Sequence, residues 1–313
     1  MSDDPSPEDD AARAAWLYYV GGMTQDQIAR EMGVSRQRAQ RLVSKAMAEG
    51  LVHVRLNHRL ASCLTLEQRL AERFALTRCR VAPGVPGLDP ALAIAPAAAA
   101  ELERVLRESD PLVIALGTGR AMRGMVEATG DVQAPQHRLV SLIGNIAPDG
   151  SASFFDVIMR LADKVRAPHY PMPVPVISAT PEENAAFRSF PPVRKVIELA
   201  QAADVTFVGV GQMGGDAPLL ADGFLTGAEL AEMQELGATG EICGWVYDSD
   251  GNYVQHGTNA RVGGIRVRPG QAAPVIGIAA GASKVPAIAA ALKSRILNGL
   301  ITDEPTARAI LGA

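Results

Sequence analysis

The first regular spacing of apolar residues, between residues 24 and 49, is that of two short helices. Ile28, Ala29 and Met32 form one apolar edge of the first segment. A longer apolar stripe follows in the second segment, formed by Ala39, Leu42, Val43, Ala46 and Met47. Because positions three or four residues apart share a face of an α-helix, the pattern predicts two amphipathic helices separated by the sequence MGVS.

The residues at the ends of these two segments favour the same boundaries. Thr24 and Ser35 can each accept a hydrogen bond from the free amides of a first helical turn. Gly33 and Gly50 can adopt the positive φ that ends a helix. Two short helices joined by a tight glycine-containing turn form a helix-turn-helix, and the second helix, here ending near Glu49, can lie in the major groove of DNA.

The polar face of the second helix carries residue types that read DNA. Arginine can make two hydrogen bonds to guanine and glutamine two to adenine, while hydroxyl groups at helix N-termini can hold phosphates. Between residues 11 and 60 there are eight basic and three acidic residues, the electrostatic footprint of a nucleic-acid-binding domain. A solvated face of an all-α domain is the alternative, but turn, caps, stripe and charge agree on DNA binding. The candidate DNA contacts are Thr24, Gln25, Ser35, Arg36, Gln37, Arg38, Gln40 and Arg41.

The flanking segments complete a predicted winged helix-turn-helix domain. Upstream, AARAAWLYYVGG predicts a third helix with Trp16, Leu17 and Val20 facing inward. Downstream, apolar and polar residues alternate from Leu51 to Leu56, which predicts a wing strand. The first ten residues, MSDDPSPEDD, hold five acids and two prolines and predict a disordered tail.

The predicted DNA-binding domain covers residues 1–60, and a second domain covers residues 61–313. In this second domain one pattern recurs: a short apolar run ends abruptly in glycine and is followed by a helical pattern. The four runs are LVIALGTG (112–119), LVSLIGN (139–145), VTFVGVGQMGG (205–215) and APVIGIAAGASK (273–284). Continuous apolar runs that alternate with helices predict a parallel sheet buried on both faces. Ligands bind such sheets at the carboxyl ends of the strands, where these glycine loops meet.

Between the two domains, TLEQRLAERFALTRCRV repeats Leu66, Leu70 and Phe74 at helical spacing. This segment is a connector helix, the first helix of the large domain, or part of a dimer seam. Two turns of pattern are too few to identify a coiled coil.

The loop GTGRAMRG is the most informative of the glycine loops. Gly117 and Gly119 let the backbone approach a ligand closely, and the helix that begins at once points its free amides at an anion, most simply a phosphate. Thr118 and Arg120 add a hydroxyl donor and a positive charge. The spacing matches neither a dinucleotide fingerprint nor a P-loop. A purely structural glycine turn is the alternative.

Further candidate ligand-binding positions follow the other strands. Asn145 follows the second apolar run, and Gly211 lies in the third glycine loop. Lys284 stands at a helix start, where the helix dipole opposes a cation, so a carboxylate or phosphate partner explains it better than a surface position does. His169 and Tyr170 lie among prolines in APHYPMPVPV and are interpreted as loop packing.

The segment GEICGWVYDSDGNYV predicts a β-hairpin. Its turn is predicted at Asp250–Gly251, because Asp-Gly is a strong hairpin signal. Glu241 and Asp248 then lie near the first strand.

Composition narrows the possible locations and cofactors. The 313 residues are 48% hydrophobic, and 34 acidic residues face 30 basic ones for a net charge of −4. No apolar run approaches the length of a membrane helix, and no signal peptide precedes the first domain, so we expect a cytoplasmic protein. The three cysteines are widely spaced and fit no zinc pattern, which predicts reduced thiols, with no metal site and no cofactor.

The chain resembles the SorC/DeoR-type family of bacterial sugar-responsive transcriptional regulators along nearly its full length. The helix-turn-helix MTQDQIAREMGVSRQRAQRLVSKAMAEGLVHV carries part of this resemblance. The other matching segments are LGTGRAM, GNIAPDGS, GEICGWVYDSDG and the C-terminal AAGASKVPAIAAALKSRILNGLITDEPTARAIL. This last segment is the most specific of them, because many families share a helix-turn-helix.

The resemblance implies an effector domain similar to the fold of glucosamine-6-phosphate deaminase and ribose-5-phosphate isomerase, without enzyme activity. It also implies a tetramer that binds an operator and responds to a sugar or phosphosugar. By position, residues 117–120 match the loop that cradles a phosphate, while Glu241 and Lys284 match residues that hold the rest of the effector. Ala121 stands where many relatives have a hydroxyl residue, so an unphosphorylated sugar or polyol is also open.

Two functions from different classes compete. The first is a regulator of a carbohydrate or polyol catabolic operon that senses a sugar, polyol or phosphosugar. The second is a sugar-phosphate isomerase or deaminase fused to a DNA-binding module. An isomerase needs a base placed to move a proton between adjacent carbons. With five histidines and no compact Asp-x-x-x-His cluster, only Glu241 remains as a candidate base, and we favour the regulator with no catalytic residue.

Overall fold

The structure, a computed structural model, describes residues 7–52, 61–147, 150–151 and 157–312. The contacts within the chain divide it into two compact units, residues 1–58 and 59–313. Among the described residues, no helix is both long enough and apolar enough to cross a membrane.

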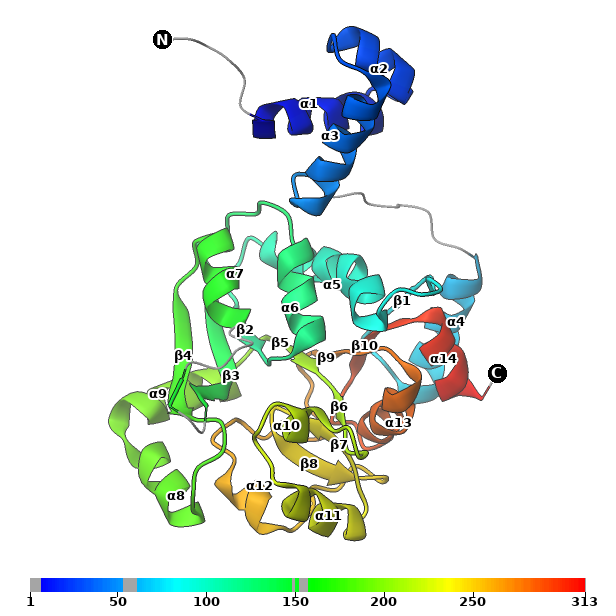
Figure 1. Ribbon diagram of the computed structural model, residues 1–313. Helices are drawn as coiled ribbons and strands as arrows, with labels where there is room; N and C mark the ends of the chain where they lie inside the picture. The colour runs from blue at the N-terminus through cyan, green and yellow to red at the C-terminus, as the bar shows by residue number, and fades with distance from the viewer. Residues whose placement is uncertain (1–6, 53–60, 148–149, 152–156, 313) are drawn as a thin grey trace. The chain divides into compact units, whose positions relative to one another are not determined.

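Three helices make up the described part of the small unit: α1 (Pro7–Tyr19), α2 (Gln25–Glu31) and α3 (Arg36–Ala48) (Figure 1). Both predicted caps are confirmed. Thr24 and Gln27 form a capping box at the start of α2, and the Ser35 hydroxyl accepts from the Arg38 amide at 3.2 Å. Gly33 adopts the predicted positive φ, at 65°, so the chain turns sharply between α2 and α3.

Two predictions for the start of the chain are wrong. Residues 7–10 belong to α1 rather than to a disordered tail, because Glu8, Asp9 and Asp10 in the first turn interact favourably with the helix dipole. Trp16 and Val20 are 59% and 69% exposed. The side of α1 that packs into the core is an alanine stripe formed by Ala11, Ala14 and Ala15, and this spacing leaves Trp16 and Val20 outside it.

The predicted wing strand lies largely outside the described residues. Leu51 and Val52 are described and are not in a strand, while residues 53–56 are not described.

The large unit is built on a sheet of seven parallel strands, confirming the predicted class. Its strands are β1 (Arg78–Ala82), β2 (Val113–Leu116), β3 (Arg138–Ile146), β4 (His169–Pro175), β5 (Val205–Gly209), β9 (Val275–Ile278) and β10 (Gly299–Asp303). They are ordered β1-β10-β9-β5-β2-β3-β4. The four glycine-ended runs form β2, β3, β5 and β9. The edge strand β4 contains three prolines and corrects the interpretation of His169 and Tyr170 as loop residues; an edge strand tolerates proline because half of its amides pair with no neighbour.

Helices cover both faces of this sheet. One face packs against α4 (Ala61–Phe74), α9 (Pro191–Gln201), α13 (Val285–Lys293) and α14 (Glu304–Leu311). The other face packs against α5 (Pro90–Leu106), α6 (Arg120–Ala128) and α7 (Val157–Val165), which lie side by side in Figure 1. Strand β2 shows the reason for the continuous apolar run, because Val113 and Ala115 enter the first core while Ile114 and Leu116 enter the second. The segment between the domains is therefore the first helix of the large unit, α4.

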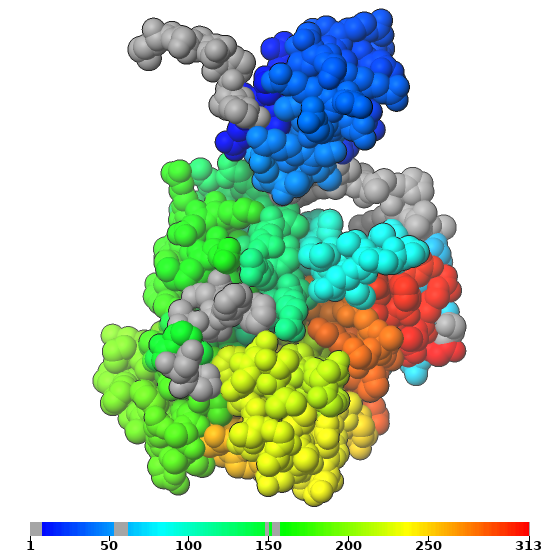
Figure 2. Space-filling view, viewed as in Figure 1, coloured from blue at the N-terminus to red at the C-terminus, as the bar shows by residue number. Residues whose placement is uncertain are grey.

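A smaller antiparallel sheet lies beside the main one. It contains β6 (Gly211–Gln212), β7 (Ala238–Ile242) and β8 (Trp245–Asp248). The segments from β6 to β8 gather into one lobe, yellow in Figure 2. Short helices complete this side of the unit: α8 (Pro181–Ser189), α10 (Pro218–Ala221), α11 (Gly227–Glu235), α12 (Gly257–Arg261) and the 3₁₀ turn η1 (Ala282–Lys284).

The turn between β7 and β8 is not where the sequence pattern placed it. Ile242 pairs with Trp245, so the two-residue turn is Cys243–Gly244, and both residues have a positive φ (53° and 82°). This is the pattern of a type I′ hairpin turn. Asp250–Gly251 form a second turn that follows β8 and returns the chain to the bridge between Tyr247 and Tyr253.

Candidate effector pocket and DNA-reading helix

A cavity of about 200 Å³ opens at the carboxyl ends of β2, β5 and β9, where open parallel sheets bind ligands. Six of the eight predicted effector residues line it: Thr118, Gly119, Arg120, Gly211, Glu241 and Lys284. Its volume lies below the 300 to 1,000 Å³ that is typical of drug-sized ligands. The cavity therefore has room for a small molecule. Whether these residues contact an effector stays a prediction.

The loop after β2 has the geometry of an anion-binding turn. The Gly117 amide donates to Phe207 O at 2.8 Å, which ties the loop to β5. Gly117 itself is buried behind the cavity, where an added Cβ would lie 3.2 Å from Cys243 Sγ and Val208. Gly119 has a φ of 113° and precedes α6, so the first amides of that helix face the cavity side without a capping side chain at that position.

Glu241 lies opposite this loop and is held by its own hairpin. Its Oε2 accepts from the Gly244 amide at 2.9 Å, across the type I′ turn. Burial raises the pKa of the Glu241 carboxyl, and the Gly244 hydrogen bond and the charge of Lys284 oppose that rise. An added Cβ on Gly211 would overlap the Glu241 side chain, with 2.8 Å to Glu241 Cγ, so a glycine is required there for the carboxylate to enter the cavity.

Lys284 reaches the cavity from the start of α13. It is half-buried, and burial lowers the pKa of its ammonium while the charge of Glu241 raises it. Asp89 also raises this pKa, and Arg120 lowers it. Glu241 and Asp89 are thus carboxylates whose charges act on Lys284.

Two acidic lining residues were missed in the sequence. Asp89 caps α5, since its Oδ1 accepts from the Ala91 amide at 2.9 Å. An Asp-Pro pair before an alanine-rich helix signals such a cap but not a cavity. Asp222 follows α10 and pairs with Arg120, 3.3 Å from Nη2 to Oδ1. No local pattern could have identified Asp222, because its partner lies 102 residues away.

Asn145, the remaining predicted residue, is not among those that line this cavity. It lies at the end of β3, and its Oδ1 is buried with no hydrogen-bond partner among the described residues. His169 and Tyr170 lie on β4 and are likewise not lining residues. The described residues contain no group of three or more His, Cys, Asp or Glu side chains that could hold a metal ion.

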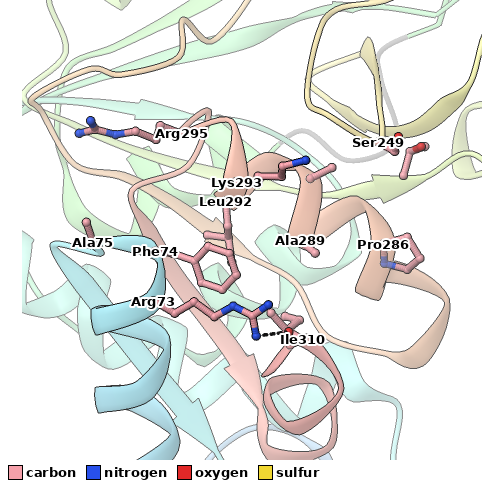
Figure 3. Close-up of a pocket in the computed structure, with 12 residues that line it drawn as sticks. Arg73, Phe74, Ala75, Ser249, Pro286, Ala289, Leu292, Lys293, Arg295 and Ile310 are labelled. Carbon is pink, nitrogen blue, oxygen red and sulfur yellow. Dashed lines mark hydrogen bonds between the residues drawn. The ribbon is translucent and has the colours of Figure 1, made fainter. Parts of the chain in front are cut away.

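A second hollow lies on the other side of α13. It is an open groove of about 670 Å³ between α13 and the ends of α4 and α14, with Phe74 and Leu292 in its wall (Figure 3). Arg73 donates to Ile310 O at 3.4 Å across it, and Lys293 pairs with Asp250 at 2.6 Å. None of the predicted site residues lines this groove.

In the small unit, the candidate DNA contacts lie on the surface. Seven of the eight are exposed and Gln25 is half-buried, while the apolar stripe of α3 packs into the core. Two arginines of α3 have acidic neighbours: Arg36 is 3.6 Å from Asp26, and Arg38 is 3.6 Å from Asp10. The polar face of α3 is therefore exposed within this unit, with exposed ion pairs that contribute little on their own.

Comparison with known families gives two matches that together span the chain. Residues 58–312 match the model of the family described as "Putative sugar-binding domain". Residues 14–58 match a model of the MarR family.

Individual proteins match over nearly the whole length. The erythritol catabolism regulatory protein EryD of Brucella abortus is 36% identical over 304 residues, 96% of each chain. The transcriptional regulator LsrR of Escherichia coli K12 is 32% identical over 311 residues, 97% of this chain and 95% of its own. The full-length sorbitol operon regulator SorC from Klebsiella pneumoniae superposes with a TM-score of 0.71 at 27% identity, covering 96% of this chain and 98% of its own. A DeoR family regulator from Listeria monocytogenes shares the fold, with a TM-score of 0.72 at 18% identity and coverage of 80% and 99%.

Proposed function

We propose, from the premise that this chain belongs to the SorC/DeoR-type family of sugar-binding transcriptional regulators, that a small carbohydrate in the cavity controls operator binding by the small unit. The effector is a sugar, polyol or phosphosugar. The observation that carries the proposal is the meeting of the glycine loop after β2, Glu241 and Lys284 at one cavity. The glycine loop precedes Glu241 and Lys284 by more than 100 residues, so a ligand that touches all of them bridges parts of the fold that otherwise meet only by packing.

The chemistry of the cavity supports a polyhydroxy ligand. Carboxylates accept hydrogen bonds from hydroxyl groups, while Arg120 and Lys284 donate to hydroxyl or phosphate oxygens. The relative at 36% identity is by name a regulator of erythritol catabolism, which supports a polyol or sugar catabolic operon as the target of this protein.

The proposal extends to DNA contacts and to assembly. The bases of the operator are read by the polar face of α3, and a helix-turn-helix protein reads two half-sites with two copies. We therefore propose a homo-oligomer and, from the family resemblance, a cytoplasmic tetramer, which light scattering with and without operator DNA would test.

We also propose that the large unit binds its ligand without turnover and without a cofactor. The relatives are transcriptional regulators. The lining carboxylates have structural partners, since Asp89 caps α5, Asp222 pairs with Arg120 and Glu241 accepts from Gly244. Assays with pentose and hexose phosphates would test this, and conversion of any of them would favour the isomerase or deaminase alternative.

Two experiments test the central proposal. Thermal-shift measurements with sugars, polyols and their phosphates identify the effector, because a ligand that binds only the native state raises the melting temperature. The effector is then titrated into the protein–operator complex. An effector-linked change in operator affinity of about 1 to 3 kcal/mol is expected, and a ligand that binds without any such change contradicts the proposed control.

A further inference from the structure

We propose that Asp222 is a charge selector: its carboxylate, beside the Arg120 guanidinium, makes the cavity favour uncharged polyhydroxy ligands over phosphomonoesters. This inference rests on the proposed function and names the ligand class of the same cavity. Arg120 begins α6, directly after the glycine loop, so its guanidinium is the cation that a phosphate in this loop would require. Asp222 Oδ1 lies 3.3 Å from Arg120 Nη2, and both residues line the cavity.

The remaining lining charges favour the same ligand class. Three carboxylates, of Asp89, Asp222 and Glu241, face the cavity with two cations, Arg120 and Lys284. Lys284 interacts with Glu241 and Asp89, and Glu241 in turn with Asp222, so these charges act on one another. Both lining cations therefore already have carboxylates near them, Asp222 beside Arg120 and Glu241 and Asp89 acting on Lys284.

A phosphomonoester adds a charge of about −1.5 to −2 at neutral pH. A phosphate that binds Arg120 comes next to the Asp222 carboxylate, because Asp222 Oδ1 lies 3.3 Å from Arg120 Nη2. Like charges at this separation repel, and partial burial reduces the screening by solvent: only 25% of the Asp222 side chain is exposed. Ala121, at the second position of α6, has no hydroxyl to offer the phosphate in compensation.

An uncharged polyol or sugar brings no charge that the lining carboxylates would repel. Its hydroxyl groups donate to carboxylate oxygens and accept from Arg120 and Lys284, so the ion pairs can stay in place while the ligand joins them. A phosphomonoester offers chiefly acceptors at its charged end, which three carboxylates cannot satisfy.

The test compares matched ligand pairs on the full-length protein by titration calorimetry. The probes are erythritol with erythritol 4-phosphate, ribitol with ribitol 5-phosphate and sorbitol with sorbitol 6-phosphate. For the wild-type protein, we expect at least one uncharged member to bind and its phosphomonoester to bind at least 10-fold more weakly. Asp222→Asn should reduce that gap at least 10-fold, because it removes the competing charge and keeps the size of the side chain.

Two variants separate the charge from other effects. Asp222→Glu keeps the charge and should keep the selectivity of the wild-type protein. Asp250→Asn removes a carboxylate from the exposed Lys293 ion pair, which lies outside this cavity, and should also leave selectivity unchanged.

The outcomes separate this inference from the proposed function. A phosphomonoester that binds wild-type protein more tightly than its uncharged partner overturns the inference and leaves the proposed function standing. So does an Asp222→Asn protein that binds an uncharged ligand with undiminished selectivity. If no uncharged or phosphorylated carbohydrate in a wider panel binds, the proposed function itself fails, and the inference with it.

Discussion

Replacing Lys284 by methionine removes the cation from the cavity and keeps most of its aliphatic stem. In the proposed complex the ammonium donates to an effector oxygen, and a hydrogen bond that involves a charged group contributes about 1.5 to 3 kcal/mol. Because about 1.4 kcal/mol corresponds to a factor of ten, effector affinity should fall about 10- to 150-fold. Operator binding in the absence of effector should stay unchanged, since the predicted DNA contacts lie in the other unit.

The same substitution changes the dependence of stability on pH. Burial holds the pKa of Glu241 above its usual value of 4.5, and Lys284 opposes that rise, so Lys284→Met should raise the pKa further. A carboxyl with a raised folded-state pKa stabilises the fold below its unfolded-state pKa and loses this contribution as the pH rises through the folded-state value. The variant should therefore lose more stability than wild-type protein as the pH rises above the ordinary carboxyl pKa of 4.5. Urea unfolding at several pH values measures this difference.

The assay for the switch is fluorescence anisotropy of a labelled operator, with effector titrated into the protein–DNA complex. Lys293→Met is the matched control, because Lys293 lies at the other end of α13, pairs with Asp250 and does not line the cavity. An undiminished response in Lys284→Met would remove Lys284 from the effector site. Loss of operator binding without effector would instead mean a structural role.

Four further predictions concern both units. Arg38→Ala or Gln37→Ala should weaken operator binding selectively by about 1 to 3 kcal/mol; an equal loss on random DNA would make the residue a phosphate contact. Asp10→Asn should tighten binding to random DNA in a filter assay at low salt, because Asp10 lies 3.6 Å from Arg38; unchanged affinity would show that the ion pair does not compete with DNA. Thr24→Ala should destabilise the protein by about 0.5 to 2 kcal/mol in chemical unfolding through loss of the α2 cap, whereas Thr24→Ser should cost far less. Gly211→Ala should abolish the thermal shift by effector, because its Cβ displaces the Glu241 side chain; a normal shift would exclude Glu241 from contact.

The elements that the sequence determined are those whose stability depends on neighbours within a few residues. The caps at Thr24 and Ser35, together with the turn at Gly33, define α2 and α3 through hydrogen bonds and φ angles that span three or four residues. The central strands are visible for a related reason. A strand buried on both faces must be apolar at every position, so β2 and β9 appear as uninterrupted apolar runs.

The edge strand and the hairpin turn could be located only from the tertiary structure. Strand β4 is exposed along one side and can contain prolines, so its sequence does not resemble that of a central strand. The turn at Cys243–Gly244 was missed because Asp-Gly at 250–251 is the stronger local signal, and pairing of Ile242 with Trp245 decides between them. Trp16 is exposed because α1 packs closely against α3 through its alanines, and Trp16 lies outside that alanine face.

The candidate site likewise has features that local sequence predicts and features that only the tertiary structure decides. Glycine at 117 and 119 and the abrupt start of α6 indicate a ligand loop from local sequence alone, and Lys284 at a helix start implies a partner of opposite charge. Which carboxylates lie near those cations depends on long-range contacts. Asp222 is 102 residues from Arg120 in the sequence, and the pairing of β9 with β5 brings the segments of Lys284 and Glu241 to the same end of the sheet. Local sequence encodes the geometry of each loop, but the charge balance of the cavity arises only where the loops from separate strands converge, because electrostatic interactions depend on distance in space rather than along the chain.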